Sequence, residues 1–438
     1  MSTTIPTPSL VSLATEILRA ATTLEDELKI QNLPAPDLSS HGRQDYLDIL
    51  TNPTAMSARS ALIEASRNML LLARGPIETL RSTVLVDRTG IMVLRVIYCL
   101  KIAEHVPLSG SISMASLAAK LDVHPTPLAR ILRFAYTMRV FHQPVDQPDT
   151  VAHTALSAAI STFDPYLWIQ LSETTKTHAA SFNFPRALKE WPASPLTLTD
   201  PQGRDFWRII QEDDPDGRGM ERFSAAMRTY MQTSHGSSNT YLVDGFDWAG
   251  LGSGTVVDVG GGNGHGSVAV ARNFPQLKVL VQDLPKNEQP AAETIQNAKL
   301  EEGRVAFQAH DFFTTQPKEL QPTAYLLSRV LHDWSDEDGV RILKHLVPAM
   351  KKDGARLIVV ERLLPDQPGE IPLHHEAQLR SLDLLMFTFY GGGCERSRQQ
   401  WENLFRAADP GLKVVNVRSW QESVGSELSM MEVRYMLN

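Results

Sequence analysis

The sequence predicts a mainly helical N-terminal half followed by a C-terminal domain built on a parallel α/β sheet. Apolar residues recur at helical spacing through the first half. From about residue 240, short β-branched runs alternate with helical segments, which is typical of a parallel sheet. A glycine-rich turn at 260–266 follows the first of these runs directly. The chain has 438 residues, enough for two or three folding units.

The helical half begins with an amphipathic helix over about residues 10–28 and continues through a linker at 32–45 that contains prolines, serines and a glycine. A long helical pattern follows at 57–86 and is interrupted at Gly75 and Pro76. Helices of this length with few aromatic residues are expected to pack on one another or on a second subunit.

A helix-turn-helix is predicted between Ser113 and Phe141, with a turn at 122–125. The spacing favours Thr126 as N-cap of the second helix and Pro127 as its first residue. Residues 140–158 are expected to form a small wing. Two functions are open for this unit: a DNA reader, or a winged-helix scaffold for dimerisation.

The charge balance favours the scaffold. The second helix carries Arg130, Arg133 and Arg139, but the chain has 42 Lys and Arg against 50 Asp and Glu, a net charge of −8. Such an acidic balance lacks the electrostatic footprint of a nucleic-acid-binding protein. No signal peptide or membrane span is recognised. The two cysteines are distant in sequence, with Cys99 expected in the core, so a cytoplasmic location is predicted.

The C-terminal half contains a succession of short apolar runs that are predicted to be strands. They lie at 255–259, 278–282, 324–327 and 356–360, with a terminal hairpin from 412–418 and 429–437.

The turn after the first strand reads Gly260, Gly261, Gly262, then Gly264 and Gly266. Glycines at a strand-to-helix turn allow positive φ and close approach of a ligand. A dinucleotide-binding turn needs G-x-G-x-x-G, which this spacing does not provide. The observed G-x-G-x-G-x-G suits the amino-acid part of S-adenosylmethionine better. A tight turn without a ligand is the alternative for the glycines alone.

Acidic residues follow the next two strands. Asp283 ends the second strand, where it is placed to accept hydrogen bonds from both ribose hydroxyls of a nucleoside. Asp311 and Phe312 lie in the loop after the third strand, where an acid and an aromatic ring suit an adenine. Taken alone, the second pair is better explained as a loop acid beside a core phenylalanine.

His332 falls in the loop at the carboxyl end of the strand at 324–327, the edge where open α/β sheets place their ligands. Histidine is the natural base for a phenol-like hydroxyl near neutral pH. Glu361 ends the next strand, and Glu395 lies in a glycine-rich loop. A carboxylate beside the imidazole would fix its tautomer and stabilise the imidazolium. No cluster has metal-ligand spacing, so no metal is expected.

Five segments carry a resemblance to a known family: DVGGGNGHG, QDLP, HDF, RVLHDWSDED and DLLMFTFYGGGCERS. They resemble the plant caffeic-acid-type, S-adenosylmethionine-dependent O-methyltransferases, and most closely their fungal secondary-metabolite branch, over residues 90–438. The resemblance implies an α/β Rossmann-like class I methyltransferase domain preceded by a mainly helical, winged-helix-containing dimerisation domain. The expected divisions are 1–160 for dimerisation, 161–245 for a helical connector that contributes to the substrate pocket, and 246–438 for the methyltransferase domain.

The same resemblance implies roles for individual residues. His332 is the catalytic base, flanked by Glu361 and Glu395. The partners implied are a natural-product substrate and a second copy of the chain, with S-adenosylhomocysteine as the product of the cofactor. The residues implied to hold the cofactor are Gly260, Gly261, Gly262, Asp283, Leu284, Asp311, Phe312, Ser328 and Arg329. Those implied to line the substrate pocket are Met231, Met386 and Tyr390. Ser328 stands where the family often has a basic residue, with Arg329 next to it.

The activity expected is methyl transfer to a hydroxyl of an aromatic or heteroaromatic fungal metabolite, a polyketide or an alkaloid. The main rival is a protein of this family that binds the cofactor without methylating and catalyses a dehydration or a pericyclic cyclisation. Two less favoured functions are those of a winged-helix regulator and of a nicotinamide-dependent oxidoreductase.

Overall fold

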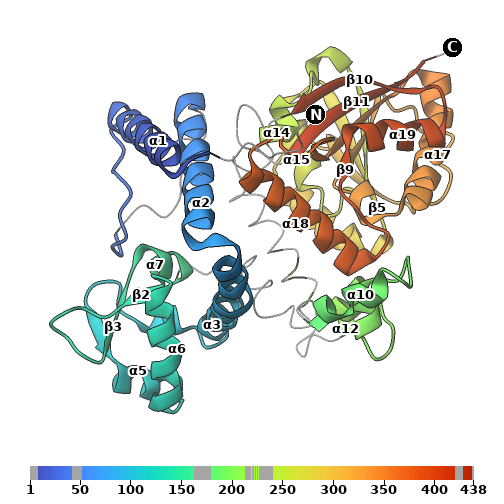
Figure 1. Ribbon diagram of the computed structural model, residues 1–438. Helices are drawn as coiled ribbons and strands as arrows, with labels where there is room; N and C mark the ends of the chain where they lie inside the picture. Colours follow the sequence, from blue (N-terminus) through green and yellow to red (C-terminus); the bar gives the residue numbers. More distant parts are fainter. Residues whose placement is uncertain are drawn as a thin grey trace. The chain divides into compact units, whose positions relative to one another are not determined.

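A computed structural model describes residues 8–41, 52–161, 179–212, 219, 221, 223, 225, 240–419 and 428–436. The chain forms two compact units (Figure 1). The first comprises Met1–Thr175 and Pro215–Tyr230, and the second comprises Lys176–Asp214 and Met231–Asn438.

The first unit begins with two packed helices, α1 (Leu10–Ile30) and α2 (Pro53–Ser82). Leu24 and Leu28 of α1 are buried against Ala55 and Ala58 of α2. The predicted interruption of the long helix is confirmed, because Gly75 has φ 70° where α2 kinks. A π-helical turn (Thr83–Asp87) then leads into α3 (Arg88–Cys99) and α4 (Ile102–His105).

The predicted helix-turn-helix and wing are both present. The two helices are α5 (Met114–Leu121) and α6 (Pro125–Thr137). Strands β1 (Ser111–Ser113), β2 (Phe141–His142) and β3 (Thr150–His153) form an antiparallel sheet in the order β1-β3-β2, and α7 (Ala155–Ser161) follows.

Two details of this unit differ from the sequence prediction. Helix α6 begins at Pro125 and not after Thr126, because the His124 side chain caps it by accepting from Thr126 N at 3.2 Å. Cys99, predicted as core, is exposed. The helix α3 buries Val93 and Ile97 on one face, and Cys99 falls on the other side of its last turn.

The second unit is built on an eight-stranded sheet. Five strands run parallel: β4 (Gly254–Val259), β5 (Leu277–Asp283), β6 (Val305–Ala309), β7 (Ala324–Ser328) and β8 (Arg356–Leu364). The predicted terminal hairpin, β10 (Leu412–Ser419) and β11 (Leu428–Tyr435), adds antiparallel strands beside β8. The order is β10-β11-β8-β7-β4-β5-β6, and the short β9 (Arg396–Ser397) pairs with β8.

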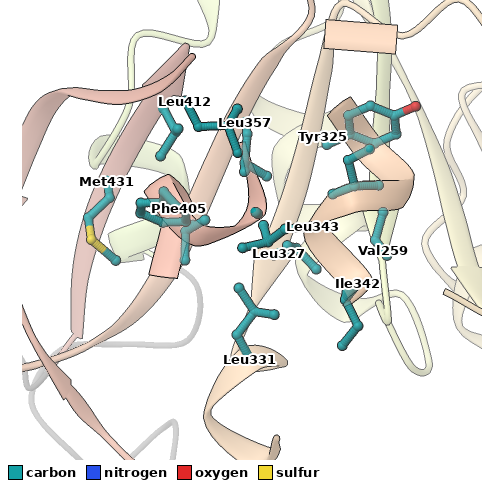
Figure 2. Packing of buried hydrophobic residues seen from close by; sticks show 14 of the residues in the cluster. Val259, Tyr325, Leu327, Leu331, Ile342, Leu343, Leu357, Phe405, Leu412 and Met431 are labelled. Atoms are coloured by element: carbon teal, nitrogen blue, oxygen red, sulfur yellow. The ribbon is translucent and has the colours of Figure 1, made fainter. Parts of the chain in front are cut away.

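Both faces of the sheet are buried, which explains why its strands are almost continuously apolar. On one face, Val259, Leu327 and Leu357 pack with residues of α17 (Asp336–Asp353) and α19 (Arg398–Ala408), including Ile342 and Phe405 (Figure 2). The opposite face packs with α14 (Thr240–Asp244), α15 (His265–Asn273) and α16 (Glu288–Asn297). The core therefore holds the strand ends in one rigid frame.

The strand order reverses at β4, which lies between β5 and β7. The chain fills the sheet on one side through β5 and β6 and then crosses to β7 on the other side. Such a reversal opens a crevice at the carboxyl ends of the strands, where α/β proteins bind their ligands. The candidate catalytic and cofactor-binding residues lie at this edge.

Short helices before β4 belong to the same unit. They are α10 (Phe184–Ala187), α11 (Pro195–Thr199) and α12 (Phe206–Glu212), and they pack on α18 (Leu373–Tyr390), the helix that follows β8. Within the described parts of the chain, no helix is long and apolar enough to cross a membrane.

Candidate active site

The glycine-rich turn lies directly against the loop that carries His332. Gly260, Gly262 and Gly264 have φ of 74°, 55° and 76°, values that L side chains rarely adopt. A Cβ on Gly260 would lie 2.9 Å from Cγ2 of Val330, so only glycine allows this approach. At Gly262 a Cβ would meet nothing within 4 Å, so this face of the turn is open. Gly260 thus allows close packing against Val330, and Gly262 leaves the turn accessible to a ligand.

Asp283 is oriented by its own surroundings. Its Oδ2 accepts from Gly262 N at 2.8 Å, and its Oδ1 accepts from Leu284 N at 2.7 Å and from Asn287 Nδ2 at 2.8 Å. The carboxylate is thereby held beside the open face of the glycine turn. Carboxylate oxygens have further lone pairs, so this arrangement fits a ribose diol.

The loop after β6 brings Asp311 and Phe312 to the same edge. Asp311 Oδ1 accepts from Phe313 N at 2.9 Å, which fixes the turn. The Phe312 ring packs edge-on against the ring of Trp334 at 5.8 Å, and a Cβ on Gly260 would lie 3.5 Å from it. An apolar ring next to the glycine turn fits one face of an adenine.

Ser328 is the last residue of β7, and Arg329 follows it directly. The Ser328 hydroxyl is buried and has no hydrogen-bond partner among the residues that the structure describes, so it is available to a ligand. Arg329 has φ 56°, an uncommon value for a non-glycine residue. Together with the open glycine face, these groups fit the amino-acid part of S-adenosylmethionine.

The structure brings His332, Glu361 and Glu395 together from three separate segments. Nδ1 of His332 lies 3.0 Å from Oε1 of Glu395 and 3.7 Å from Oε2 of Glu361. The two glutamates are fully enclosed, and the His332 side chain is 11% exposed. Nδ1 is therefore committed to a carboxylate, and Nε2 lies 3.4 Å from Oδ1 of Asp333.

The two glutamates have different partners. Glu361 Oε1 accepts from the backbone N–H groups of Val330 and Leu331, both at 3.0 Å, so it anchors the histidine loop to β8. Glu395 Oε1 accepts from His332 Nδ1 and also from Arg362 Nη1 at 3.0 Å. Glu361 holds the backbone of the loop, whereas Glu395 holds the imidazole.

Burial and charge set the protonation of this group. Burial alone would lower the pKa of His332, but the charges of Glu361, Glu395 and Asp333 outweigh it and raise that pKa to about 9. Burial raises the pKa of Glu361 to about 7 against the opposing charge of His332. For Glu395, burial is outweighed by His332 and Arg362, which lower its pKa to about 2. Glu395 is thus the permanent anion of the site.

The described residues contain one group of three side chains that could hold a metal ion, and it is this same trio, with ligand atoms within 4.8 Å of one another. Its two carboxylates already accept hydrogen bonds from backbone amides, from His332 and from Arg362. That no metal is needed stays a prediction.

A second arginine fastens the two loops of the site to each other. Arg396, 1% exposed, donates to the carbonyl oxygens of Leu331 at 2.9 Å and Trp334 at 2.8 Å, and its Nε contacts Asp336 at 2.8 Å. Cys394 N also donates to His332 O at 2.9 Å. His332 therefore sits in a loop that is held on both sides.

Arg362 and Arg396 were not singled out from the sequence. Each directly follows a site glutamate, in Glu361-Arg362 and Glu395-Arg396. That repeated acid–base pair was an available signal, since a buried carboxylate needs a compensating cation or donor.

Aromatic side chains gather along α18 next to the catalytic loop. Phe206 of α12 stacks on Phe389 with ring centroids 4.3 Å apart, and its edge faces Tyr390 at 5.4 Å. Burial raises the pKa of Tyr390 well above its ordinary value. Met386 is half-buried on the same helix, and Met231 lies outside the described residues.

Comparison with known proteins now decides the family. Residues 204–409 match the O-methyltransferase domain, and residues 89–162 match the O-methyltransferase dimerisation domain. The chain is 34% identical over 432 residues to the grayanic acid biosynthesis cluster O-methyltransferase of Cladonia grayi, covering 97% of this chain and 87% of the relative. The chain belongs to the O-methyltransferase family. It is an S-adenosylmethionine-dependent O-methyltransferase.

Further relatives and solved structures agree with this assignment. The O-methyltransferase pgmB of Aspergillus terreus is 32% identical, covering 97% of this chain and 96% of the relative. The structure of the mitomycin 7-O-methyltransferase MmcR is 27% identical with a TM-score of 0.65, covering 87% of this chain and 99% of the other. OxaC, solved in complex with S-adenosylhomocysteine and oxaline, shares the fold with a TM-score of 0.71 at 19% identity, over 97% of this O-methyltransferase and 100% of OxaC.

The match to the dimerisation domain also bears on the role of the winged helix. Its presence supports a homodimer and does not favour a DNA reader. Around the start of this match the helices of the first unit expose large apolar side chains, as a subunit surface requires. They include Ile77, Leu80, Val84, Leu85 and Met92.

Proposed function

We propose that this O-methyltransferase methylates a phenolic hydroxyl of a fungal polyketide or alkaloid, with His332 as the general base. The observation that carries the proposal is the 3.0 Å contact between His332 Nδ1 and Glu395, at the end of the sheet where the glycine turn meets the histidine loop. This contact fixes the tautomer of the imidazole, so that Nε2 is the nitrogen that would take the proton of the acceptor.

The residues proposed to hold S-adenosylmethionine are those that the family resemblance implies. The backbone at Gly260, Gly261 and Gly262 would approach the methionine part, with Ser328 and Arg329 beside it. Asp283 with Leu284 would bind the ribose, and Asp311 with Phe312 the adenine. When bound, S-adenosylmethionine supplies a methyl group that its sulfonium makes electrophilic.

His332 then has one task, the removal of a proton from the acceptor oxygen. A free phenol has a pKa of about 10, so little phenolate exists at neutral pH. The pKa of His332, about 9, is close to that of the phenol, so the proton passes to Nε2 without a large uphill step. Glu395 stabilises the imidazolium that results, and Glu361 keeps the loop in place. Orientation of the acceptor supplies the remaining acceleration.

The substrate class is supported by two observations. The relative from Cladonia grayi is named for a grayanic acid cluster, and NcsB1, which shares the fold with a TM-score of 0.62, was solved with 2-hydroxy-5-methyl naphthoic acid. The aromatic rings of Phe206, Phe389 and Tyr390 offer flat apolar surfaces for such rings. From the connector, 161–245, we include Phe206 in the pocket on the same ground.

We place the enzyme in the cytoplasm. Its two cysteines, Cys99 and Cys394, form no disulfide in the described structure, which suits a reducing compartment. Imaging of a fluorescent fusion in a fungal host tests this point, and a signal confined to an organelle would contradict it.

The experiment for the reaction itself uses the purified full-length enzyme, S-adenosylmethionine and three acceptors: 2-hydroxy-5-methyl naphthoic acid, 1,4-dihydroxy-2-naphthoic acid and meleagrin. A product heavier by one CH2 is expected from at least one, with loss of turnover in His332→Gln. Binding of S-adenosylhomocysteine to His332→Gln, measured by calorimetry, separates a catalytic defect from a folding defect. Product that gains no methyl mass and still forms with S-adenosylhomocysteine would instead support a non-methylating reaction.

A further inference from the structure

Arg362 lies on β8 immediately after Glu361, yet its side chain contacts the other glutamate of the site. Its Nη1 donates to Oε1 of Glu395 at 3.0 Å. The arginine side chain is 6% exposed and the glutamate 0%. The same oxygen of Glu395 receives Nδ1 of His332 at 3.0 Å.

These contacts form a buried chain of three groups, Arg362 to Glu395 to His332. A buried carboxylate is stable as an anion only with a cation or several donors close to it. Before His332 is protonated, Arg362 is the cation in contact with Glu395 Oε1 in the described structure. Arg362 therefore compensates the charge that the histidine needs as its partner.

The arrangement also separates the two glutamates. Glu361 and Glu395 both face Nδ1 of His332, at 3.7 and 3.0 Å. The described structure gives an arginine contact to Glu395 and backbone N–H contacts to Glu361. Two like charges close together cannot both ionise readily, so the one beside the cation keeps its charge. In agreement, the pKa of Glu395 is lowered while burial raises that of Glu361.

We propose that Arg362 is a positioning residue for the methyl-transfer reaction: through its contact with Oε1 it directs Glu395 at Nδ1 of His332 and offsets part of the charge of this carboxylate, which limits how strongly His332 holds a proton. This role rests on His332 being the base of the proposed function. Arg362 contacts neither reactant and acts only through Glu395 and His332.

Several more charged and titratable groups face this chain and stay in place when Arg362 is replaced. They are Asp333 next to His332 on its loop, Glu361 on β8, Asp383 and Tyr390 on α18, Cys394 on the loop after α18, and Arg396 at the start of β9. Most of the ionised ones are carboxylates. Loss of Arg362 therefore leaves His332 among excess negative charge, and the imidazolium becomes easier to form.

The test compares Arg362→Met and Arg362→Lys with wild type by histidine NMR on the full-length protein without cofactor. The Met variant is expected to raise the titration midpoint of His332 by about one pH unit. The Lys variant returns the positive charge and is expected to bring the midpoint most of the way back to the wild-type value. With 2-hydroxy-5-methyl naphthoic acid, or whichever acceptor the wild type methylates, the acid limb of the pH–rate profile moves up by the same amount. The rate near neutral pH then falls about tenfold.

The matched control is Arg356→Met. Arg356 lies at the other end of β8 and pairs with Glu432 at 3.7 Å, so its loss removes an arginine–carboxylate contact from the same strand without touching His332. The His332 titration is expected to be unchanged. An equal shift in this control would show that strand β8 and not the Arg362 contact is responsible, and would overturn the proposal.

The double variant Arg362→Met/Glu395→Gln tests whether the effect of Arg362 on His332 passes through Glu395. It also leaves no unpaired buried carboxylate at position 395, so it serves if the single variant Arg362→Met does not fold. We compare the His332 midpoint of the double variant with that of Glu395→Gln. The difference is expected to be much smaller than the shift that Arg362→Met produces in the wild-type background. An equal shift, or a folded Arg362→Met protein whose His332 titrates as in wild type, would refute the inference. Because the NMR readout needs no acceptor, failure of the proposed substrate class leaves this test intact.

Discussion

Replacing Glu395 by glutamine tests the electrostatic basis of the site most directly. The amide is nearly the same size as the carboxylate and keeps an oxygen that can accept from His332 Nδ1, now 3.0 Å from Oε1 of Glu395. What the variant removes is one buried negative charge. The hydrogen bond from Glu395 N to Asp383 at 2.9 Å is a backbone contact and remains possible.

The size of the effect follows from the distance. Two unit charges about 4 Å apart attract by about 4 kcal/mol at an effective dielectric constant of about 20. Since one pKa unit is about 1.36 kcal/mol, the charge of Glu395 accounts for about three units. Glu361 and Asp333 still face His332, whose pKa is about 9 in the wild type. We therefore expect the His332 midpoint to fall to about 6 to 7 in Glu395→Gln.

The consequence for the rate depends on pH. At about pH 7 only about 1% of the wild-type His332 is neutral, because its pKa lies about two units higher. The variant has far more neutral imidazole there, which offsets its poorer stabilisation of the imidazolium. Above about pH 9 this offset vanishes, and the variant is expected to be slower by about 100-fold. The two rates thus approach each other in acid and diverge in base.

The assay combines histidine NMR titration with pH–rate profiles of kcat/KM for the acceptor. Glu376→Gln is the control, because Glu376 is buried on α18 but pairs with Arg380 at 3.2 Å and not with His332. A His332 midpoint that stays near 9 in Glu395→Gln would refute the reasoning. So would a loss of rate that is equal at about pH 7 and at about pH 9.5.

Three further predictions concern the cofactor, the core and metal ions. Asp283→Ala is expected to weaken S-adenosylhomocysteine binding by about 100-fold or more in calorimetry, because two hydrogen bonds to a charged group are each worth about 1.5–3 kcal/mol. An unchanged Kd would contradict the ribose role. Phe405→Ala, at a side chain with 0% exposure, should lower the free energy of unfolding in urea by about 3–5 kcal/mol, whereas Leu373→Ala, exposed on α18, should change it by less than about 0.5 kcal/mol. Treatment with EDTA should leave methyl transfer unaffected, and restoration of lost activity by added Zn²⁺ or Mg²⁺ would show that His332, Glu361 and Glu395 hold a metal.

The periodicity of apolar residues predicted most of the architecture. The strands around 256, 279, 325 and 358, the terminal hairpin, the kink at Gly75 and the helix-turn-helix were all read from local patterns, because each depends on side chains close in sequence. The start of α6 was misplaced because a histidine, His124, caps it in place of the residue that capping preferences favour. Cys99 is exposed because it lies on the side of α3 opposite to the buried residues Val93 and Ile97. The composition of the segment does not show which side of a helix faces the core.

The sequence by itself determined the family, the fold and the identity of three candidate catalytic side chains, since these depend on residue types at fixed spacing. Only the tertiary structure decided how the two glutamates differ. Glu361 and Glu395 are separated by 34 positions, and nothing in the sequence says which one receives an arginine and which one receives two backbone amides. The parallel pairing of β7 with β8 places Glu361 against the backbone of the histidine loop, and the loop after α18 folds back so that Glu395 contacts Arg362 and His332. The physical reason is that charge in a buried site is set by the nearest donors, and these are supplied by segments distant in the chain.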